Sequence, residues 1–438
     1  MNHYSRRDLF RLSAFTAMNA LAQPAGDYKA LVCLFLFGGN DGNNMVLPLS
    51  PAAFNAYKSV RGTLALPDTS AKLLAMEGAD GLPYGMNDGL AGIHPLWAQG
   101  KLAAVANMGN LVRPTTRSEY LARSAPVPTN LFSHSDQTSQ IQSGFPNSGA
   151  GTGWAGRVAD AANPQNGGSS FPASVSMAGP ALFCAGGIVQ SASLVPDFDL
   201  SLYGMDFWPS AASQARKAAL QELLTFDSGL TLVQAANRVR QDALSLNAML
   251  RDTAASPPLA TSFPATTLGR QLRQVAKLIQ LRGETGMKRQ VFFCGLGGFD
   301  THGSQGWMHW DLLSQVGATM QAFYQSTVDL GVANQVTAFT LSEFGRSLQP
   351  SGTGSDHGWG NNQLVMGGAV QGGRLYGSFP QFALGGPDDS GNRGVWIPTT
   401  STDQFGATLA SWFGVTSAQL PAVFPNLANF PTANLGFV

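Results

Sequence analysis

Charged residues are scarce in this sequence. Only 12% of its 438 residues are Asp, Glu, Lys or Arg, about half the share in an average globular protein. The 26 basic and 26 acidic residues cancel, and no run of Lys or Arg occurs. This balance excludes a strong electrostatic attraction to nucleic acid or to an anionic membrane surface.

Cysteine and long apolar runs are also scarce. The three cysteines, Cys33, Cys184 and Cys294, permit at most one disulfide, which excludes a disulfide-built scaffold. Cys33 and Cys294 lie within apolar stretches, so we predict buried free thiols there. No segment is long enough, without glycine or charge, to span a bilayer, which takes about 20 apolar residues. Stable membrane insertion is therefore not expected.

The sequence is rich in hydrophobic residues, at 44%, and it contains 51 glycines and 25 prolines. Apolar segments recur along most of its length, which predicts an ordered protein with a large core. The glycines and prolines predict long and numerous loops.

The N-terminus resembles a twin-arginine export signal, because Arg6 and Arg7 precede a hydrophobic segment. Residues 12–22 are moderately apolar and free of acid, and they end in the small-x-small form that a signal peptidase cuts. We predict a signal peptide over residues 1–22 and a mature protein in the periplasm or outside the cell. The alternative is an amphipathic N-terminal helix with a chance arginine pair.

Strand-like and helix-like segments alternate through the mature chain. Continuous apolar runs predict buried strands at 29–37, 102–107, 290–295 and 336–341. Helical patterns lie at 153–162, 211–252, 266–281, 307–330 and 402–413. This alternation predicts one α/β domain over residues 23–438, with a mainly parallel sheet covered by helices on both faces. Three patches, at 141–153, 253–265 and 348–362, are expected to be loops or a small lid.

Polar side chains follow three of the predicted strands. Asp41 follows the first, Asp300 and His302 follow the third, and Glu343 follows the fourth. In such sheets, ligands bind beyond the carboxyl ends of the strands. We therefore expect these groups to meet at one edge of the sheet.

A second Asp–His pair, Asp356 and His357, lies in a predicted glycine-rich loop. Carboxylates and imidazoles together are a common ligand set for zinc or manganese, whereas calcium and magnesium suit two histidines less well. The candidate metal ligands are Asp41, Asp300, His302, Glu343, Asp356 and His357. Structural roles stay open: a turn for Asp41, a helix cap for Glu343 and a satisfied loop histidine for His357.

The segment around Ser133 supplies candidate catalytic groups. Ser133 precedes a helix-like stretch, where a serine is most often an N-cap. Beside a metal, its hydroxyl would instead act as a nucleophile. His134 would bind an oxyanion, and Arg157 and Arg346 would clamp an anionic group unless they form surface salt bridges. His309 is expected at the surface.

The ordered set of motifs resembles an exported bacterial family known as domain of unknown function 1501. The motifs, which extend to about residue 375, are the twin-arginine start, FGGNDGNN at 37–44, Ser133-His134, GWAGR at 153–157, GFDTH at 298–302, SEFGR at 342–346 and DHGWG at 356–360. More remotely, that family is similar to the alkaline phosphatase superfamily of phosphatases, sulfatases and cofactor-independent phosphoglycerate mutases.

The resemblance implies a three-layer α/β/α sandwich, alkaline-phosphatase-like, with metals bound at strand ends. It also implies that Ser133 is the nucleophile and that Asp41, Asp300, His302 and His357 bind metal. Two departures affect this assignment. Asp300 and His302 are separated by one residue, whereas the corresponding Asp and His of the superfamily are separated by three. Phe344 stands where the superfamily has a histidine. One of two metal sites is then lost or rebuilt with Asp356.

Together these features predict an exported hydrolase of phosphate or sulfate esters that uses one or two zinc or manganese ions. Its substrate would be a small anionic ester or a polymer. The alternative is a non-catalytic secreted protein of the same fold that binds a polymer or a partner exported protein through its long loops. The family resemblance supports such a partner, because genes of this family often lie beside genes of another exported family.

Overall fold

The computed structural model describes residues 27–196, 204–227, 229–252 and 257–438. The predicted signal peptide, residues 1–22, lies outside these ranges. The described residues divide into two compact units, one within Met1–Leu194 and Thr261–Val438 and the other within Val195–Ala260. The single domain expected over residues 23–438 stays a prediction. Among the described helices, none has both the length and the apolar character that a membrane span requires.

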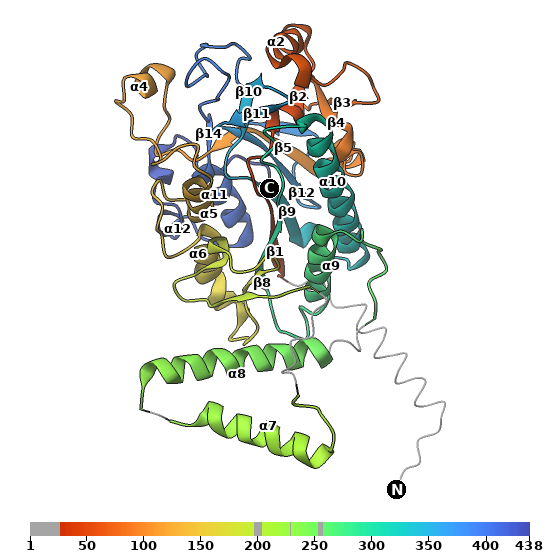
Figure 1. Cartoon of the computed structure of the whole chain (residues 1–438), viewed down its shortest axis with the longest axis vertical. Helices are drawn as coiled ribbons and strands as arrows, with labels where there is room; N and C mark the ends of the chain where they lie inside the picture. Colours follow the sequence, from red (N-terminus) through yellow and green to blue (C-terminus); the bar gives the residue numbers. More distant parts are fainter. Residues whose placement is uncertain (1–26, 197–203, 228, 253–256) are drawn as a thin grey trace. The chain divides into compact units, whose positions relative to one another are not determined.

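The larger unit is built on a nine-stranded sheet (Figure 1). Its strands are β1 (Lys29–Leu36), β5 (Leu102–Gly109), β6 (Ser174–Ser176), β7 (Ser191–Ser193), β8 (Arg289–Leu296), β9 (Val336–Leu341), β12 (Asn361–Gly367), β13 (Arg374–Tyr376) and β14 (Thr400–Ser401). Their order is β13-β5-β12-β9-β1-β8-β6-β7, and β14 also pairs with β5. β12 is antiparallel to both neighbours, and the other pairs are parallel. The predicted α/β class with a mostly parallel sheet is confirmed.

Strand β1 lies inside the sheet because its side chains are apolar on both faces. All of its residues except the first are buried. Leu31 pairs with Val291 of β8 on one side and with Thr337 of β9 on the other. All three cysteines are buried and free, as predicted for Cys33 and Cys294. Because β9, β1 and β8 are parallel neighbours, their carboxyl ends lie side by side.

Helices lie on two sides of this sheet, with α9 and α10 on one side and α5, α6 and α11 on the other (Figure 1). The described helices of the larger unit are α2 (Pro51–Arg61), α3 (Pro95–Ala98), α4 (Arg117–Leu121), α5 (His134–Ser143), α6 (Trp154–Ala162), α9 (Thr267–Gln280), α10 (Gln305–Asp329), α11 (Thr402–Phe413) and α12 (Leu420–Val423). Helix α9 illustrates how an amphipathic helix packs on the sheet. Its apolar residues recur every three or four positions, and they are all fully buried: Leu268, Leu272, Val275 and Ile279.

Two smaller sheets complete this unit. One is antiparallel and contains β2 (Val46–Pro48), β4 (Pro83–Asn87) and β3 (Leu73–Glu77). The other is a hairpin of β10 (Arg346–Ser351) and β11 (Gly354–His357). The hairpin corrects the loop predicted over 348–362. It reverses at Gly352, whose φ is 63°, and it brings His357 opposite Arg346.

The smaller unit contains α7 (Ser210–Thr225) and α8 (Thr231–Asp252). The sequence predicted one helical segment across 211–252, and the structure divides it. Gly229 has a φ of 68°, and its N–H donates to the Asp227 carboxylate at 2.9 Å. A left-handed glycine of this kind ends a helix and starts a turn.

Candidate metal centre

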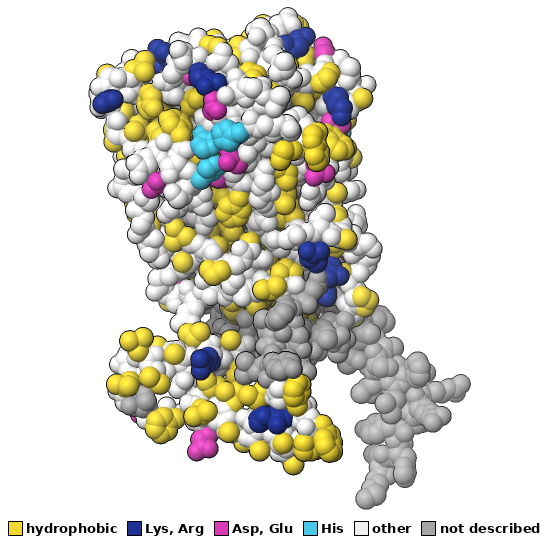
Figure 2. Space-filling view, viewed as in Figure 1, with side chains coloured by type: hydrophobic (Ala, Val, Ile, Leu, Met, Phe, Trp, Pro, Cys, Tyr) yellow, Lys and Arg dark blue, Asp and Glu magenta, His cyan; other side chains and the backbone are white. Residues whose placement is uncertain are grey.

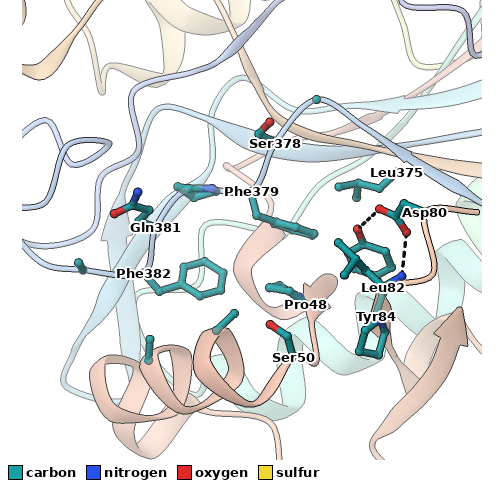
Figure 3. Close-up of a pocket in the computed structure, with 16 residues that line it drawn as sticks. Pro48, Ser50, Asp80, Leu82, Tyr84, Leu375, Ser378, Phe379, Gln381 and Phe382 are labelled. Carbon is teal, nitrogen blue, oxygen red and sulfur yellow. Dashed lines mark hydrogen bonds between the residues drawn. The ribbon is translucent and has the colours of Figure 1, made fainter. Parts of the chain in front are cut away.

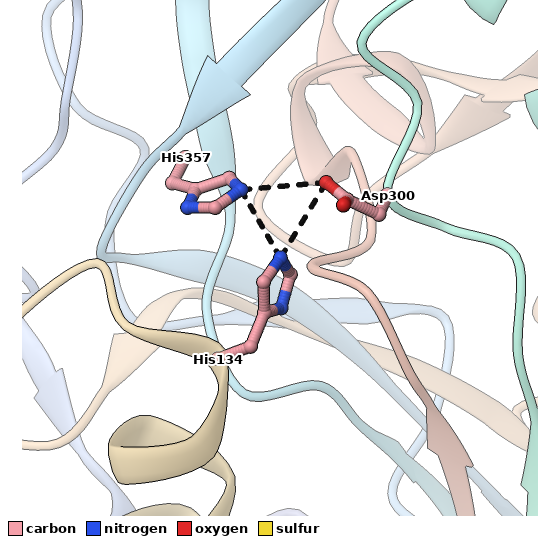
Figure 4. Close-up of side chains that lie close together, drawn as sticks. All are labelled: His134, Asp300 and His357. Carbon is pink, nitrogen blue, oxygen red and sulfur yellow. Dashed lines mark hydrogen bonds and ion pairs between the residues drawn. The ribbon is translucent and has the colours of Figure 1, made fainter.

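Two imidazoles and a carboxylate point toward one another at the surface of the larger unit. His134 begins α5, His357 ends β11, and Asp300 follows β8 (Figure 4). The Nε2 atoms of His134 and His357 are 3.1 Å apart. They lie 3.5 Å and 3.3 Å from Asp300 Oδ1. These ligand atoms all fall within 4.8 Å of one another.

A third imidazole lies against this group. His302 Nε2 is 2.9 Å from Asp300 Oδ1 and 3.1 Å from His357 Nε2. We call His134, His302, His357 and Asp300 the His/Asp cluster. Ligands placed tetrahedrally at about 2.0–2.1 Å from a zinc ion lie about 3.3–3.4 Å from one another. The three separations among His134, His357 and Asp300, 3.1–3.5 Å, bracket that spacing, and His302 Nε2 lies beside two of these three atoms.

Acceptors at Nδ1 orient two of the three imidazoles. They are the Phe132 carbonyl at 2.8 Å for His357 and Glu343 Oε1 at 2.9 Å for His134. Asp356 Oδ1 lies 3.8 Å from His302 Nδ1, which is too far for a hydrogen bond. A carbonyl oxygen or an ionised carboxylate offers lone pairs alone, so Nδ1 of His357 and of His134 donates. Their Nε2 atoms, when the rings are neutral, then carry lone pairs that face Asp300. A cation would stabilise these lone pairs, which otherwise face one another and Asp300. In metal sites, a histidine that binds the ion through one ring nitrogen usually donates a hydrogen bond from the other.

The ends of three neighbouring strands position the acidic groups. Glu343 follows β9 and is buried, and its Oε1 accepts a 2.8 Å bond from Gly38 N, just beyond β1. Gly38 has a φ of 116°, and a Cβ there would lie 2.3 Å from Asp300 N. Glycine is required at this position by both the backbone angle and the close approach. The end of β1 thereby links the residues that follow β8 and β9.

The environment shifts the pKa values of the cluster in opposite directions. The hydrogen bond that His134 donates to Glu343 raises the pKa of His134 above its usual value, whereas burial lowers the pKa of His357. Burial by itself would raise the pKa of Asp300, but the hydrogen bond and charge of Arg346, helped by His302 and His134, hold it below its usual value. Asp300 is therefore a carboxylate at neutral pH.

Phe344 forms an apolar floor under the cluster. Its ring centroid lies 4.8 Å from that of His134 and 4.8 Å from that of His357. Gly39 makes room for it, because a Cβ at that residue would lie 2.4 Å from the Phe344 ring. The ring offers no ligand atom beneath the two histidines.

Solvent reaches the cluster from one face of the protein. The side chains of its four members are 25–48% exposed. Figure 2 shows histidine side chains gathered on the surface, with acidic and basic side chains beside them. A small molecule in solution can therefore approach the ligand atoms.

Asp41, predicted as a metal ligand, has a different partner. Its carboxylate forms an ion pair with Arg61 of α2 and accepts a 2.6 Å bond from Gln305 Nε2. Both members of the pair are fully buried. The carboxylate of Asp41 is therefore the partner of a buried guanidinium in the core. Among the described residues, Asp41 does not belong to the group that could hold a metal ion.

Ser133 and the two predicted arginines make contacts within the protein. Ser133 is the N-cap of α5, and its Oγ lies 2.7 Å from Asp136 Oδ2. Arg157 donates to three backbone carbonyls, those of Ser143, Thr152 and Val423. Arg346 is buried and donates to Asp300 Oδ1 at 3.1 Å. Of these three, only Arg346 has a contact with the cluster.

His309 was expected at the surface, but it is buried. Its Nε2 lies 2.9 Å from Asn40 Oδ1, and burial lowers its pKa to about 4. It lies on α10, and its ring packs edge-on against Phe299.

Sequence reasoning missed two contributors to the site. The Phe132 carbonyl holds His357, and a main-chain group leaves no signal in the residue type. Phe132 adopts a φ of 73° there, a rare value for a bulky residue. Arg393 lies in a glycine-rich loop far along the chain, and its Nη1 is 2.7 Å from Asp356 Oδ2. Only the fold brings that loop to the site.

A separate pocket of about 560 Å³ lies elsewhere on this unit (Figure 3). Aromatic and aliphatic side chains line most of it, including Tyr84, Phe379 and Phe382. Its one carboxylate, Asp80, accepts bonds from the Tyr84 hydroxyl and from Leu82 N. None of its lining residues belongs to the His/Asp cluster.

The fold and the cluster define an α/β protein with a candidate metal centre at the carboxyl ends of its strands. The chain belongs to the family described as "Protein of unknown function (DUF1501)", whose model matches residues 28–390. No curated protein matches it. Chains of solved structures do match, among them one described as "Crystal structure of Ps i-CgsB in complex with k-i-k-neocarrahexaose", which is 10% identical. The match covers 91% of this chain and 77% of that chain, with a TM-score of 0.36.

Proposed function

We propose that this chain is an exported, metal-dependent hydrolase of phosphate or sulfate esters, built on an alkaline-phosphatase-like α/β/α sandwich. The observation that carries the proposal is the convergence of imidazole nitrogens and one carboxylate oxygen at separations of 2.9–3.5 Å. Helices on two sides of a mostly parallel sheet support the fold.

The ligand set favours one transition-metal ion over a two-metal site. His134, His357 and Asp300 would hold it, with His302 beside them and a fourth position left for water, and nitrogen ligands with one oxygen favour zinc, with manganese as the alternative. Glu343 orients an imidazole and is a supporting group in this proposal. When bound, such an ion supplies a Lewis acid and lowers the pKa of water.

The charge around the cluster suits an anionic substrate. Three carboxylates, Asp300, Glu343 and Asp356, and two guanidiniums, Arg346 and Arg393, are linked to it by direct contacts. With neutral imidazoles these groups have a formal charge of −1, which a divalent ion would change to +1. A positively charged, solvent-accessible site attracts a phosphate or sulfate ester.

Water, and not Ser133, is the proposed nucleophile. The Ser133 hydroxyl caps α5 and contacts Ser135 and Asp136, and among the residues that the structure describes it has no hydrogen bond with the cluster. In the reaction, the oxygen of water bonds to phosphorus or sulfur, the bond to the ester oxygen breaks, and the alcohol leaves with a proton. Asp300 would remain ionised throughout, because Arg346 holds its pKa low.

The test combines metal analysis with assays on aryl phosphates and aryl sulfates. We expect about one zinc or manganese ion per chain and turnover of at least one ester class, with both lost in His357→Ala. The matched control is His94→Ala, whose Nε2 contacts the Ala75 carbonyl. Protein that binds no metal when supplied with both ions would refute the proposal. Full metal content without turnover would favour the non-catalytic binding protein.

A further inference from the structure

Arg393 borders the His/Asp cluster through a single carboxylate. Asp356 Oδ2 lies 2.7 Å from Arg393 Nη1, and Asp356 Oδ1 lies 3.8 Å from His302 Nδ1. The Arg393 side chain is 43% exposed. One carboxylate therefore separates the guanidinium from His302, and the guanidinium is open to solvent.

The loop that carries Arg393 is held in place. Asp389 is fully buried, and its two carboxylate oxygens accept bonds from the N–H groups of Gly385, Gly391, Gly394 and Val395. The loop is also bonded to β10, because Gln349 N donates to the Arg393 carbonyl at 3.0 Å. A fixed main chain sets the position of the Arg393 backbone, and the contact with Asp356 restrains its side chain, which reduces the entropy lost when the guanidinium binds a ligand.

The other cation at the cluster is already occupied. Arg346 is 1% exposed, and it donates to the carbonyls of Gly38 and Ser355 as well as to Asp300. Within the described residues, the contacts of the Arg393 guanidinium are with Asp356 and, at 3.4 Å, with the Pro350 carbonyl. A guanidinium has five N–H groups in a planar fork, so most of them remain available.

We propose that Arg393 is the anion-binding residue of this site and that it donates to the non-bridging oxygens of a phosphate or sulfate group. The proposal rests on the proposed function and names the group of the substrate that the chain recognises. A planar fork matches two oxygens of a tetrahedral oxyanion, a geometry that lysine cannot reproduce. Recognition of the oxyanion by Arg393 would leave the rest of the ester free to vary.

The experiment is calorimetric titration of the zinc-loaded full chain with inorganic phosphate and, separately, with sulfate. Arg393→Met should weaken binding at least about tenfold, since a hydrogen bond to a charged group is lost. The oxyanion affinity of Arg393→Lys should lie between that of the wild type and that of Arg393→Met. Arg113→Met is the matched control, because it removes another half-buried guanidinium whose contacts are Pro114 and Glu119. Metal content is measured for each variant.

The outcomes separate this inference from the proposed function. Wild-type protein that binds zinc but neither oxyanion, or an Arg393→Met variant with unchanged oxyanion affinity, overturns the role of Arg393 alone. Loss of zinc from Arg393→Met in parallel with loss of oxyanion affinity also overturns it, because Arg393 would then only hold Asp356 in place. A wild-type chain that binds no metal overturns the proposed function itself.

Discussion

The most direct prediction is that metal binding stabilises this protein through His357. Zinc or manganese should raise the melting temperature, and His357→Ala should abolish the rise. The substitution removes an Nε2 that lies 3.1–3.3 Å from three other ligand atoms. It also removes the Nδ1 donor to the Phe132 carbonyl.

The size of the effect follows from mass action. At a metal concentration 100 times the dissociation constant, binding stabilises the folded state by about 2.7 kcal/mol. An unfolding entropy of about 2.1 cal/mol/K per residue amounts to about 0.9 kcal/mol/K over 438 residues. The melting temperature should then rise by about 3 °C. A loss of affinity of about 100-fold in His357→Ala would leave about 0.4 kcal/mol, or less than about 1 °C.

Differential scanning fluorimetry on chelated protein, with and without added metal, measures this shift. His94→Ala is the control and should keep the full rise, because its ring contacts a backbone carbonyl outside the cluster. Either of two results would refute the reasoning: no shift in the wild-type protein with zinc or manganese, or an unchanged shift in His357→Ala.

Three further predictions concern buried groups. Glu343→Gln should lower zinc affinity about 10–100-fold, since the carboxylate orients His134; chelator competition measures this, and equal affinity would show that the bond is not needed. Burial raises the pKa of Asp403 to about 7, so the folded state binds the proton of this carboxyl more tightly than the unfolded state does. As the pH rises from 4 to 7, the contribution of Asp403 to the free energy of unfolding therefore falls by up to about 4 kcal/mol. Asp403→Asn should remove this loss in urea unfolding at the two pH values, and a pH dependence equal to that of the wild type would contradict it. Arg61→Met should cost about 3–5 kcal/mol, because it leaves Asp41 buried without its partner; a loss under about 1 kcal/mol in urea unfolding would argue against the ion pair.

The elements of the fold were largely predictable from the sequence. Continuous apolar runs located β1, β5, β8 and β9 to within one or two residues, and helical spacing located α6, α9 and α11 equally well. These patterns are local, because a buried strand or an amphipathic helix repeats its apolar residues within a few positions. The α7–α8 break was missed although Gly229 carried the signal.

The candidate site was only partly predictable. Strand ends pointed to Asp300 and His302, and they do lie in the cluster. Glu343 and Asp356 were expected to bind metal, and the structure places them beside the imidazoles at Nδ1. His134 was expected to bind an oxyanion and instead has its Nε2 among the ligand atoms.

By itself, then, the sequence determined the α/β class, the buried strands and the edge of the sheet at which polar groups gather, because each depends on neighbours within a few residues. Only the tertiary structure decided which of those groups face one another. His134 and Glu343 are 209 positions apart, and Asp41 is paired with an arginine that α2 brings into the core. Such pairings depend on how the helices and loops pack around the sheet, and local pattern does not encode that packing.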